Sequence, residues 1–332
     1  MRIDASAPTR MDLAGGTIDI WPLYLFHHGA QTLNVAISLR ARCTLVPRTD
    51  GRILIRSEDT ATEVEAKHWS DLREGGELRL VARLLHFFEA GGLEITTRCE
   101  SPIGAGIAGS SALNIAICGA LARWRGLDLT PDTLLQIAQN VEAQAIDVPT
   151  GAQDYRPALY GGISAVELRV DGVRRVGLDV DPADIERRFV LAYTGASRNS
   201  GINNWEMFKR HIEGDREVVE CFDRIRDAAS GMRAALEARD WAEVGRQLNA
   251  EWDHRKRLAP GVTTPAIEDL IARARAAGAI GAKVCGAGGA GCLFCYTDPG
   301  DGPAVRRALA EGGARVLDYR VERDGLRVDV TA

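Results

Sequence analysis

The alternation of apolar and polar residues along this chain predicts a series of β-strands. Successive side chains of a strand point to opposite faces, so a half-buried strand is apolar at every second position, whereas a buried one is a short apolar run. Segments of these two kinds cover residues 31–46, 52–56, 93–97, 163–168, 189–193 and 292–296.

Apolar residues spaced three and four apart predict helices between these strands. Residues 71–90 have this spacing and stop at Gly91-Gly92. Thr130-Pro131 opens a helix that reaches about residue 144, with proline in its first turn. Further helices are expected over residues 110–125, 203–257, 264–277 and 302–312, and a final pair of strands follows.

This mixture of strands and helices predicts an α+β fold with two layers in each domain. A length of 332 residues suits two domains or one large one. The best boundary lies around Asp181-Pro182. We therefore expect an N-terminal domain over residues 1–183 and a C-terminal domain over residues 184–332.

Composition narrows the class of protein. The chain is 45% hydrophobic and 26% charged, with a net charge of −5 and no basic block, which argues against nucleic acid as a partner. No apolar run reaches the length of a membrane span, and residues 1–4 do not read as a signal peptide. We expect no membrane partner.

Seven scattered cysteines stand mostly in apolar surroundings. Cys292 and Cys295 form a Cys-x-x-Cys, but within a strand this spacing places them on opposite faces. Buried, reduced cysteines are therefore expected rather than a redox pair, and with them a cytoplasmic location.

The most informative segment is the glycine-rich stretch over residues 101–112. It holds Gly104, Gly106 and Gly109, followed by Ser110 and Ser111, between a predicted strand and a predicted helix. Glycine allows a backbone to approach a ligand closely, and a helix N-terminus offers unpaired N–H groups. Together these features favour an anion cradle, most often for phosphate. The serine hydroxyls suit a helix cap or a ligand of phosphate-bound Mg²⁺.

Two other phosphate motifs also contain glycines spaced like those of this segment. The Lys-Ser/Thr ending of a P-loop is missing, which disfavours a P-loop NTPase. The Gly-x-Gly-x-x-Gly form, with Asp128 about 20 residues on, keeps a dinucleotide site as an alternative. That fingerprint gives no role to the two serines, and its strand normally opens the domain.

Three further features have functional and purely structural explanations. Residues 7–19 read as a strand ending in a Gly-Gly turn with Asp19 at its polar tip. Glu142 on a helix and Asp154 in a loop could serve phosphoryl transfer, or could simply be solvated. Residues 286–291 contain four glycines, which is unusual for a turn alone and permits close backbone contact.

The order of these motifs resembles that of the GHMP kinase superfamily. Residues 102–112 match the family's Pro-x-x-Gly-Leu-Gly-Ser-Ser-Ala phosphate loop, with Ile107-Ala108 in place of the usual leucine. Residues 7–19 resemble its first motif and residues 283–291 its third. The resemblance implies a two-domain GHMP kinase fold: an N-terminal domain like a ribosomal protein of the small subunit, and a ferredoxin-like C-terminal domain.

Within the superfamily, the details are most similar to sugar-phosphate kinases that act on D-glycero-D-manno-heptose 7-phosphate. The segments that support this likeness are Ala14-Gly15-Gly16, residues 151–154, Tyr160-Gly161-Gly162, residues 193–198 and residues 258–265.

The resemblance implies a role for each matching residue. Asp154 would be the catalytic carboxylate, with Arg10 near it or near the transferred phosphate, and Ser111 and Glu142 would ligate Mg²⁺. ATP would bind to Pro102, Gly104, Ala105, Gly106, Ile107, Ala108, Gly109, Ser110, Ser111 and Ala112. The acceptor would contact Gly15, Gly16, Asp19, Ser197, Arg198, Gly288 and Gly289; Ser197 and Arg198 suit a phosphate already on the sugar.

The first motif departs from the family pattern and leaves the acceptor open. The heptose-phosphate kinases read Gly-Gly-Gly-Thr-Asp, whereas residues 15–19 have one glycine fewer and Ile18 before the aspartate. Trp21 and Tyr24 suit either sugar stacking or a core. His27-His28 reads as a strand-edge or loop pair rather than as metal ligands, because no third ligand is in register.

The sequence thus predicts an ATP- and Mg²⁺-dependent kinase of a sugar or sugar phosphate, with a heptose 7-phosphate-like acceptor favoured. A homodimer is compatible with the resemblance. The alternatives are a kinase of a non-sugar alcohol such as mevalonate or homoserine, a non-catalytic sugar-binding regulator of the same fold, and, as an outsider, a nicotinamide oxidoreductase.

Overall fold

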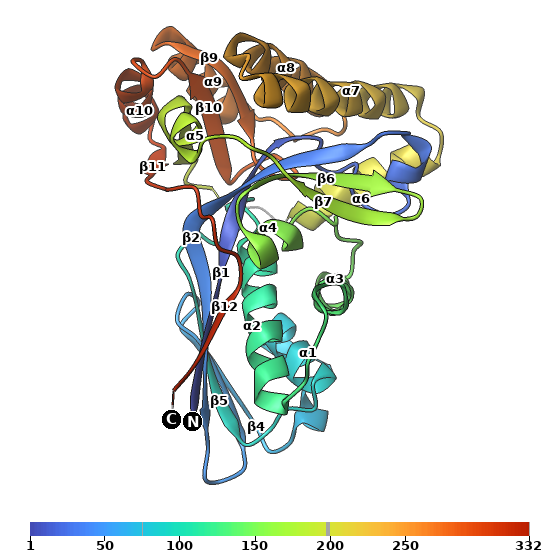
Figure 1. Cartoon of the computed structure of the whole chain (residues 1–332), viewed down its shortest axis with the longest axis vertical. Coiled ribbons are helices and arrows are strands. Elements are labelled where there is room, and N and C mark those ends of the chain that lie inside the picture. Colours follow the sequence, from blue (N-terminus) through green and yellow to red (C-terminus); the bar gives the residue numbers. More distant parts are fainter. Residues whose placement is uncertain (75, 197–199, 332) are drawn as a thin grey trace.

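The computed structural model describes residues 1–74, 76–196 and 200–331, and within them the strands form one sheet of eight and one of four (Figure 1). The larger sheet has the order β12-β1-β2-β5-β3-β4, and β6 pairs with β2 and β7. Of its pairings only β3 with β5 is parallel. Its strands are β1 (Arg2–Ala14), β2 (Gln31–Pro47), β3 (Ile53–Ser57), β4 (Thr62–Ala66), β5 (Leu93–Cys99), β6 (Ile163–Arg169), β7 (Gly172–Gly177) and β12 (Arg327–Thr331).

The smaller sheet is antiparallel, with the order β11-β8-β10-β9. It lies at the opposite end of the molecule from the two chain ends (Figure 1). Its strands are β8 (Phe189–Tyr193), β9 (Ala279–Val284), β10 (Cys292–Thr297) and β11 (Arg315–Leu317).

The helices fall into two groups. Those beside the larger sheet are α1 (Arg79–Phe87), α2 (Gly109–Arg125), α3 (Pro131–Ile146) and α4 (Tyr155–Tyr160), with the short 3-10 turns η1 (Leu23–Phe26), η2 (Trp69–Leu72) and η3 (Gly76–Leu78). The later ones are α5 (Pro182–Arg188), α6 (Ser200–Ile212), α7 (Arg216–Ala238), α8 (Trp241–Arg255), α9 (Pro265–Ala276) and α10 (Gly302–Glu311).

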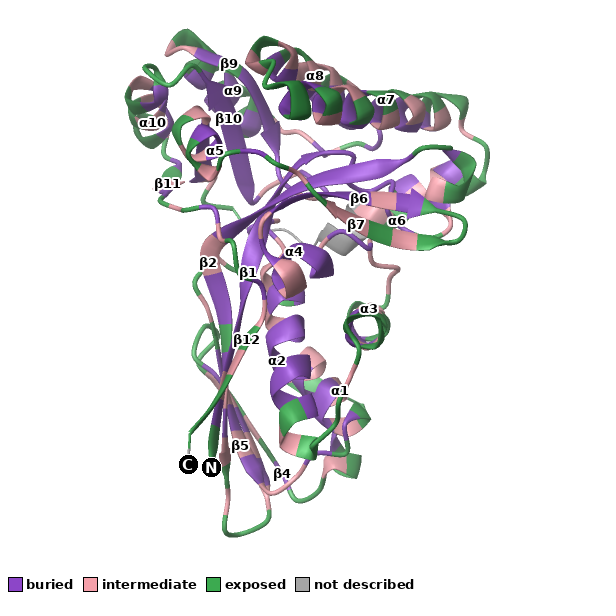
Figure 2. Cartoon of the chain, viewed as in Figure 1, coloured by how far each residue is buried: buried purple, intermediate pink, exposed green. Residues whose placement is uncertain are grey.

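Helix α2 is the centre of the N-terminal core. Residues 114–122 of this helix are all buried, as Figure 2 shows, because small and aliphatic side chains surround it. It packs on β1 and β2, with α1, α3 and α4 beside it. The N-terminus of α2 is therefore held rigidly at the end of the glycine loop.

The helix expected over residues 71–90 is wrong in its first half. That half contains η2 and η3, and the α-helix begins only at Arg79. Gly76 has a φ of +63°, a left-handed conformation that a continuous helix does not accommodate. The helices opened by Thr130 and Thr264 are confirmed, and both threonines cap through their side chains.

The last two strands do not form a pair. Strand β11 pairs with β8 in the smaller sheet, whereas β12 pairs with β1 in the larger one. The expectation of a final strand pair is therefore wrong, although both strands exist. The division of the chain at residues 183/184 stays a prediction, and residues 327–331 return to the larger sheet despite it.

The seven cysteines are free thiols, as expected. Cys292 and Cys295 both lie on β10 but belong to different apolar clusters, on opposite faces of the strand. Burial raises the pKa of each of these two thiols to about 12, so neither is a reactive thiolate at neutral pH.

Among the residues that the structure describes, no helix is long and apolar enough to cross a bilayer.

Candidate active site

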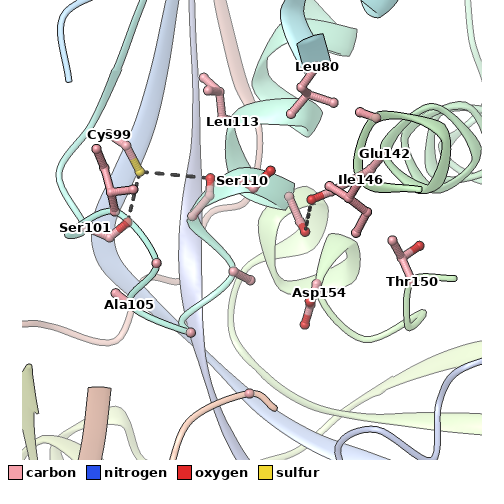
Figure 3. Close-up of a pocket in the computed structure, with 18 of the residues that line it drawn as sticks. Leu80, Cys99, Ser101, Ala105, Ser110, Leu113, Glu142, Ile146, Thr150 and Asp154 are labelled. Atoms are coloured by element: carbon pink, nitrogen blue, oxygen red, sulfur yellow. Dashed lines mark hydrogen bonds between the residues drawn. The ribbon is translucent and has the colours of Figure 1, made fainter. Parts of the chain in front are cut away.

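A cavity of about 500 Å³ lies between the glycine loop, the end of α3, residues 148–154 and the residues that follow β1. Figure 3 shows Ser110, Glu142, Thr150 and Asp154 around this space. The cavity also reaches Asn204 of α6 and the second glycine loop at Gly286.

The two glycine loops touch each other through their backbones. A Cβ on Gly106 would lie 2.8 Å from the carbonyl oxygen of Cys285, and one on Gly291 would lie 2.6 Å from that of Ala105. The amide of Cys292 donates to the same Ala105 oxygen at 2.7 Å. Only glycine allows this approach, so the loops predicted from separate motifs form one backbone surface.

The first loop delivers the N-terminus of α2 to the cavity. Ala108, the N-cap residue, has a φ of +59° and makes no side-chain cap. The first N–H groups of a helix have no intrahelical partner, and the dipole is positive there. This end of α2 therefore presents donors that suit phosphate oxygens.

Asp154 meets the guanidinium of Arg10 beside this loop. Both Arg10 Nε and Nη2 donate to Asp154 Oδ1, at 3.0 and 2.7 Å. Arg10 Nη1 also donates to the Gly106 carbonyl at 2.9 Å. The side chain of Asp154 is 29% exposed and that of Arg10 only 3%. The carboxylate thus faces the cavity on a fixed support.

Arg10 is the first of several buried charges that alternate in sign. Its Nη1 donates to Asp12 Oδ1 at 3.2 Å, and Lys283 Nζ donates to Asp12 Oδ2 at 3.2 Å. Lys283 Nζ also donates to Glu251 Oε1 at 3.2 Å, and Arg255 Nε donates to the same oxygen at 2.7 Å. We call these residues, from Asp154 through Arg10, Asp12, Lys283 and Glu251 to Arg255, the ion chain.

The ion chain crosses from the larger sheet to the C-terminal elements. Arg10 and Asp12 lie on β1, whereas Lys283 lies on β9. Burial would raise the pKa of Asp12, but Lys283, Arg10 and Arg255 outweigh it and hold that pKa below its usual range. Burial would likewise lower the pKa of Arg10, but Asp154 and Asp12 outweigh it and raise that pKa. Both groups therefore stay ionised at neutral pH.

Arg255 ties the far end of the ion chain to the first glycine motif. Its Nη2 donates to the Gly16 carbonyl at 2.9 Å and its Nη1 to Thr17 Oγ1 at 3.2 Å. Asp12 Oδ1 accepts the amide of Gly286 at 3.0 Å. One network of charges thus positions both the turn after β1 and the second glycine loop.

Asp19 is fixed against the loop that carries Asp154. Its Oδ2 accepts the amide of Gln153 at 2.8 Å, and its carbonyl accepts the amide of Ala152 at 3.3 Å. Gly151 makes this possible, because a Cβ there would lie 2.1 Å from Asp19 Oδ2. Burial, with the nearby charge of Asp154, raises the pKa of Asp19 to about 6.

Ser111 and Glu142 lie in contact, and their role as Mg²⁺ ligands stays a prediction. Ser111 Oγ donates to Glu142 Oε1 at 3.2 Å, and Asn114 Nδ2 donates to Oε2 at 3.3 Å. Burial raises the pKa of Glu142. Among the described residues, no three His, Cys, Asp or Glu side chains converge as a metal site would require.

The structure separates the other predicted site residues into two sets. Most of the first glycine loop lines the cavity, but Ile107 and Ala112 are core residues. The cavity lining, among the described residues, leaves out Gly15, Gly16, Gly288 and Gly289. The amide of Gly289 donates to the Val262 carbonyl, and a Cβ on Gly15 would lie 2.0 Å from Gln31 O. Ser197 and Arg198 lie outside the described residues, so their part in the site, like that of Gly16, Gly288 and Gly289, stays a prediction.

Of the aromatic and histidine residues after Asp19, Tyr24 and His27 pack into the fold, whereas Trp21 and His28 are exposed. His27 is buried and bonds Asp223 at 3.0 Å and His211 at 2.9 Å, while His28 is exposed. Tyr24 packs against the C-terminal core, and Trp21 is 64% exposed. The histidines are a loop pair, as expected.

Sequence reasoning missed Asp12, Asn114, Glu251 and Arg255, and it assigned no role to Lys283. A signal existed for three of them. Asp12 stands between Met11 and Leu13 at the apolar end of β1, Lys283 interrupts the apolar strand β9, and Asn114 interrupts the apolar helix α2. A charge or amide within an apolar element requires a buried partner.

Comparison with known protein families gives two matches. The family described as "GHMP kinases N terminal domain" matches residues 78–162, and "GHMP kinases C terminal" matches residues 232–315. Together they cover just over half of the chain, one on each side of the predicted domain boundary.

Known proteins resemble the chain along nearly its whole length. The D-glycero-alpha-D-manno-heptose 7-phosphate kinase of Campylobacter jejuni is 29% identical, with 98% of each chain covered. The mevalonate kinase of Thermococcus sibiricus is 25% identical, with 99% of each covered. The solved structure of a D-glycero-D-manno-heptose 1-phosphate kinase from Bacteroides thetaiotaomicron has a TM-score of 0.80 at 26% identity, and 99% of each chain is covered.

The ion chain yields a prediction for stability. Lys283→Met leaves the carboxylates of Asp12 and Glu251 buried without their shared cation, so we expect a loss of about 3–5 kcal/mol in the free energy of unfolding. Lys256→Met is the control, because Lys256 bonds Asp253 on the surface and should cost about 1 kcal/mol or less.

Urea unfolding at pH 7 and at pH 5 measures both variants. The deficit of Lys283→Met should shrink at the lower pH, because the buried carboxylate of Asp12 takes up a proton more readily once Lys283 no longer lowers its pKa. If Lys283→Met lowers the free energy of unfolding no more than Lys256→Met does, the ion chain does not contribute the predicted stability.

Proposed function

The chain belongs to the GHMP kinases, and on that basis we propose that it transfers the γ-phosphoryl group of ATP to a hydroxyl of a sugar phosphate. The observation that carries this proposal is the position of Asp154. This carboxylate is held by Arg10 directly beside the glycine loop, whose Gly106 carbonyl binds the same guanidinium. A proton acceptor and a phosphate cradle thus share one support.

The cavity suits ATP in one orientation. The triphosphate would lie along residues 104–111, against the backbone N–H groups and the N-terminus of α2. Beyond this loop the cavity is lined by apolar side chains, among them Leu80, Leu113 and Ile146 (Figure 3). These side chains would cover the base, while the γ-phosphate would point toward Asp154.

The transfer step follows from this placement. The acceptor oxygen attacks the γ-phosphorus and forms a new O–P bond, while the bond from that phosphorus to the β–γ bridging oxygen breaks and ADP leaves with the electron pair. Within the described residues, the hydrogen bonds to Asp154 end on Oδ1. Asp154 Oδ2 would therefore take the hydroxyl proton and pass it to water.

Mg²⁺ fits the donor set at Ser111 and Glu142. A hydroxyl and a carboxylate are oxygen ligands of the kind this ion prefers, and both side chains line the cavity beside the phosphate loop. Bound there with ATP, the ion would neutralise the charge that develops on the phosphates. Asn114 would hold the Glu142 carboxylate in place.

We propose a heptose phosphate as the acceptor, on the basis of the relatives and of the polar residues in the cavity. Two of the relatives are named as heptose-phosphate kinases, and Asp19 places a buried carboxylate near Asp154. Ser197 and Arg198 are proposed to bind the phosphate already on the sugar. A cytoplasmic location, supported by the free thiols, and a homodimer complete the proposal.

A substrate panel tests the function. ADP release is measured with ATP-Mg²⁺ and D-glycero-D-manno-heptose 7-phosphate, its 1-phosphate isomer, galactose, mevalonate or homoserine. We expect the highest kcat/KM with a heptose phosphate. Some relatives are named mevalonate kinases, so a preference for mevalonate would show that the acceptor is this alcohol and not a sugar phosphate. No ADP release with any compound would indicate a non-catalytic regulator.

Asp154→Asn should lower kcat by about 10²- to 10⁴-fold with little change in ATP affinity, because the amide cannot take the hydroxyl proton. The measurements are steady-state kinetics with the preferred acceptor and equilibrium binding of ATP. Turnover at the wild-type rate would remove Asp154 from the mechanism.

Asp19 should give acceptor binding a dependence on pH. Because its pKa is raised to about 6, Asp19 is protonated below that pH and accepts hydroxyl hydrogen bonds less well. The acceptor KM of the wild type should therefore rise as pH falls through 6. The acceptor phosphate titrates in both enzymes, so the ratio of wild-type KM to that of Asp19→Asn isolates this residue; a flat ratio between pH 5 and 8 would contradict the assignment.

The Mg²⁺ ligands are tested by titration of the ion at saturating ATP. Ser111→Ala and Glu142→Gln should each raise the Mg²⁺ concentration for half-maximal activity by about tenfold or more. Asp132→Asn, an exposed carboxylate at the start of the same helix α3, serves as the control. Unchanged Mg²⁺ titrations of both variants would exclude this pair as ligands.

A further inference from the structure

Two buried oxygens beside Asp154 have no hydrogen-bond partner among the residues that the structure describes. They are Asp19 Oδ1 and Gln153 Oε1, and both residues line the cavity. Asp19 is 1% exposed and Gln153 is 5% exposed, so these atoms are largely shielded from bulk water. An unpaired buried acceptor costs roughly 1–3 kcal/mol, which a ligand that donates hydrogen bonds would recover.

The fold holds these two residues together. Ile20 and Gly151 form an isolated β-bridge, which joins the turn after β1 to the loop before α4. The backbone amide of Gln153 donates to Asp19 Oδ2, and this hydrogen bond holds the carboxylate of Asp19 beside Gln153. The unpaired oxygens are therefore part of a fixed surface.

The side chain of Gln153 is also constrained. Its Nε2 lies over Gly16, where an added Cβ would approach it to 2.9 Å. Arg255, the last member of the ion chain, holds the carbonyl of the same Gly16. Gly16 thus makes room for the amide of Gln153, and the ion chain fixes the backbone beneath it.

We propose that Gln153 is a specificity-determining residue for a polyol acceptor, and that its Oε1 accepts a hydrogen bond from a hydroxyl neighbouring the one that is phosphorylated. This inference rests on the proposed function. Asp154 takes the attacking hydroxyl, and Gln153, the preceding residue in the chain, takes an adjacent one. The acceptor class is then a sugar phosphate with neighbouring hydroxyls.

The same chemistry selects against other acceptors. A carboxylate next to the attacked hydroxyl would bring lone pairs toward two oxygens that already lack donors, and Asp19 would repel its charge. A site built to bind a hydroxyl rejects an analogue that lacks it, because the site's own polar groups are left unpaired.

The test combines a variant with acceptor analogues. Wild type and Gln153→Met are assayed with D-glycero-D-manno-heptose 7-phosphate and with its monodeoxy analogues, each lacking one ring hydroxyl. With the wild type, one analogue should lose about 10- to 100-fold in kcat/KM. Gln153→Met should show that loss with the full acceptor and no further loss with that analogue, because the two changes remove the same hydrogen bond.

Two further variants control for folding and for the chemical change. Gln136→Met makes the same replacement on the exposed face of α3 and should match the wild type. Gln153→Glu keeps an acceptor oxygen and should retain the preference for the hydroxyl even where Gln153→Met is poorly folded. Thermal unfolding and ATP affinity are recorded for every variant.

The outcomes separate this inference from the function on which it rests. If the wild type releases no ADP with any sugar phosphate, the proposed function fails. If the wild type is active but Gln153→Met remains within twofold of it, or if each deoxygenation costs both enzymes equally, the role of Gln153 is overturned and the function stands.

Discussion

The structure depends on the chain of buried charges that joins its two sheets. Isolated, each of these ions would be prohibitively costly in an apolar interior, but each meets at least one opposite charge. Arg10 and Asp12 come from the larger sheet, while Lys283, Glu251 and Arg255 come from the C-terminal elements. Arg10 pairs with Asp12 and Asp154 within the first part, and Glu251 pairs with Lys283 and Arg255 within the second. The ion pair between Asp12 and Lys283 joins the two, so the chain of charges is complete only when both parts are docked.

The glycine loops express the same constraint in the backbone. Each occupies space that a side chain on the other would need, so the loop before α2 and the loop before β10 have one relative placement. A phosphate cradle built in this way needs little reorganisation when its ligand arrives. Preorganised donors of this kind are the main means by which a protein stabilises charge that develops during phosphoryl transfer.

Features that depend on neighbouring residues could be predicted from the sequence, whereas contacts between residues far apart in the chain could not. The cradle follows from Gly104 to Ser111 because turn chemistry and helix ends are properties of neighbouring residues. The placement of Ser111 and Glu142 at one site was predicted only through a family resemblance. No spacing rule links Asp12 to Lys283, which lie 271 residues apart, so the ion chain emerges only from the fold. The same limit explains why β11 and β12 were wrongly expected to pair: they are consecutive strands in the sequence, but each pairs with a different distant strand.

The pairing of β12 with β1 has a consequence for how the chain folds. Arg2 lies opposite Thr331, so this pairing forms only when two segments far apart in the sequence meet. Until then the outer edge of β1 is an open template of N–H and C=O groups, which invites pairing with other chains. Contacts of such long range also slow folding. The five residues of β12 therefore protect the edge of β1, and a chain without them would leave that edge exposed.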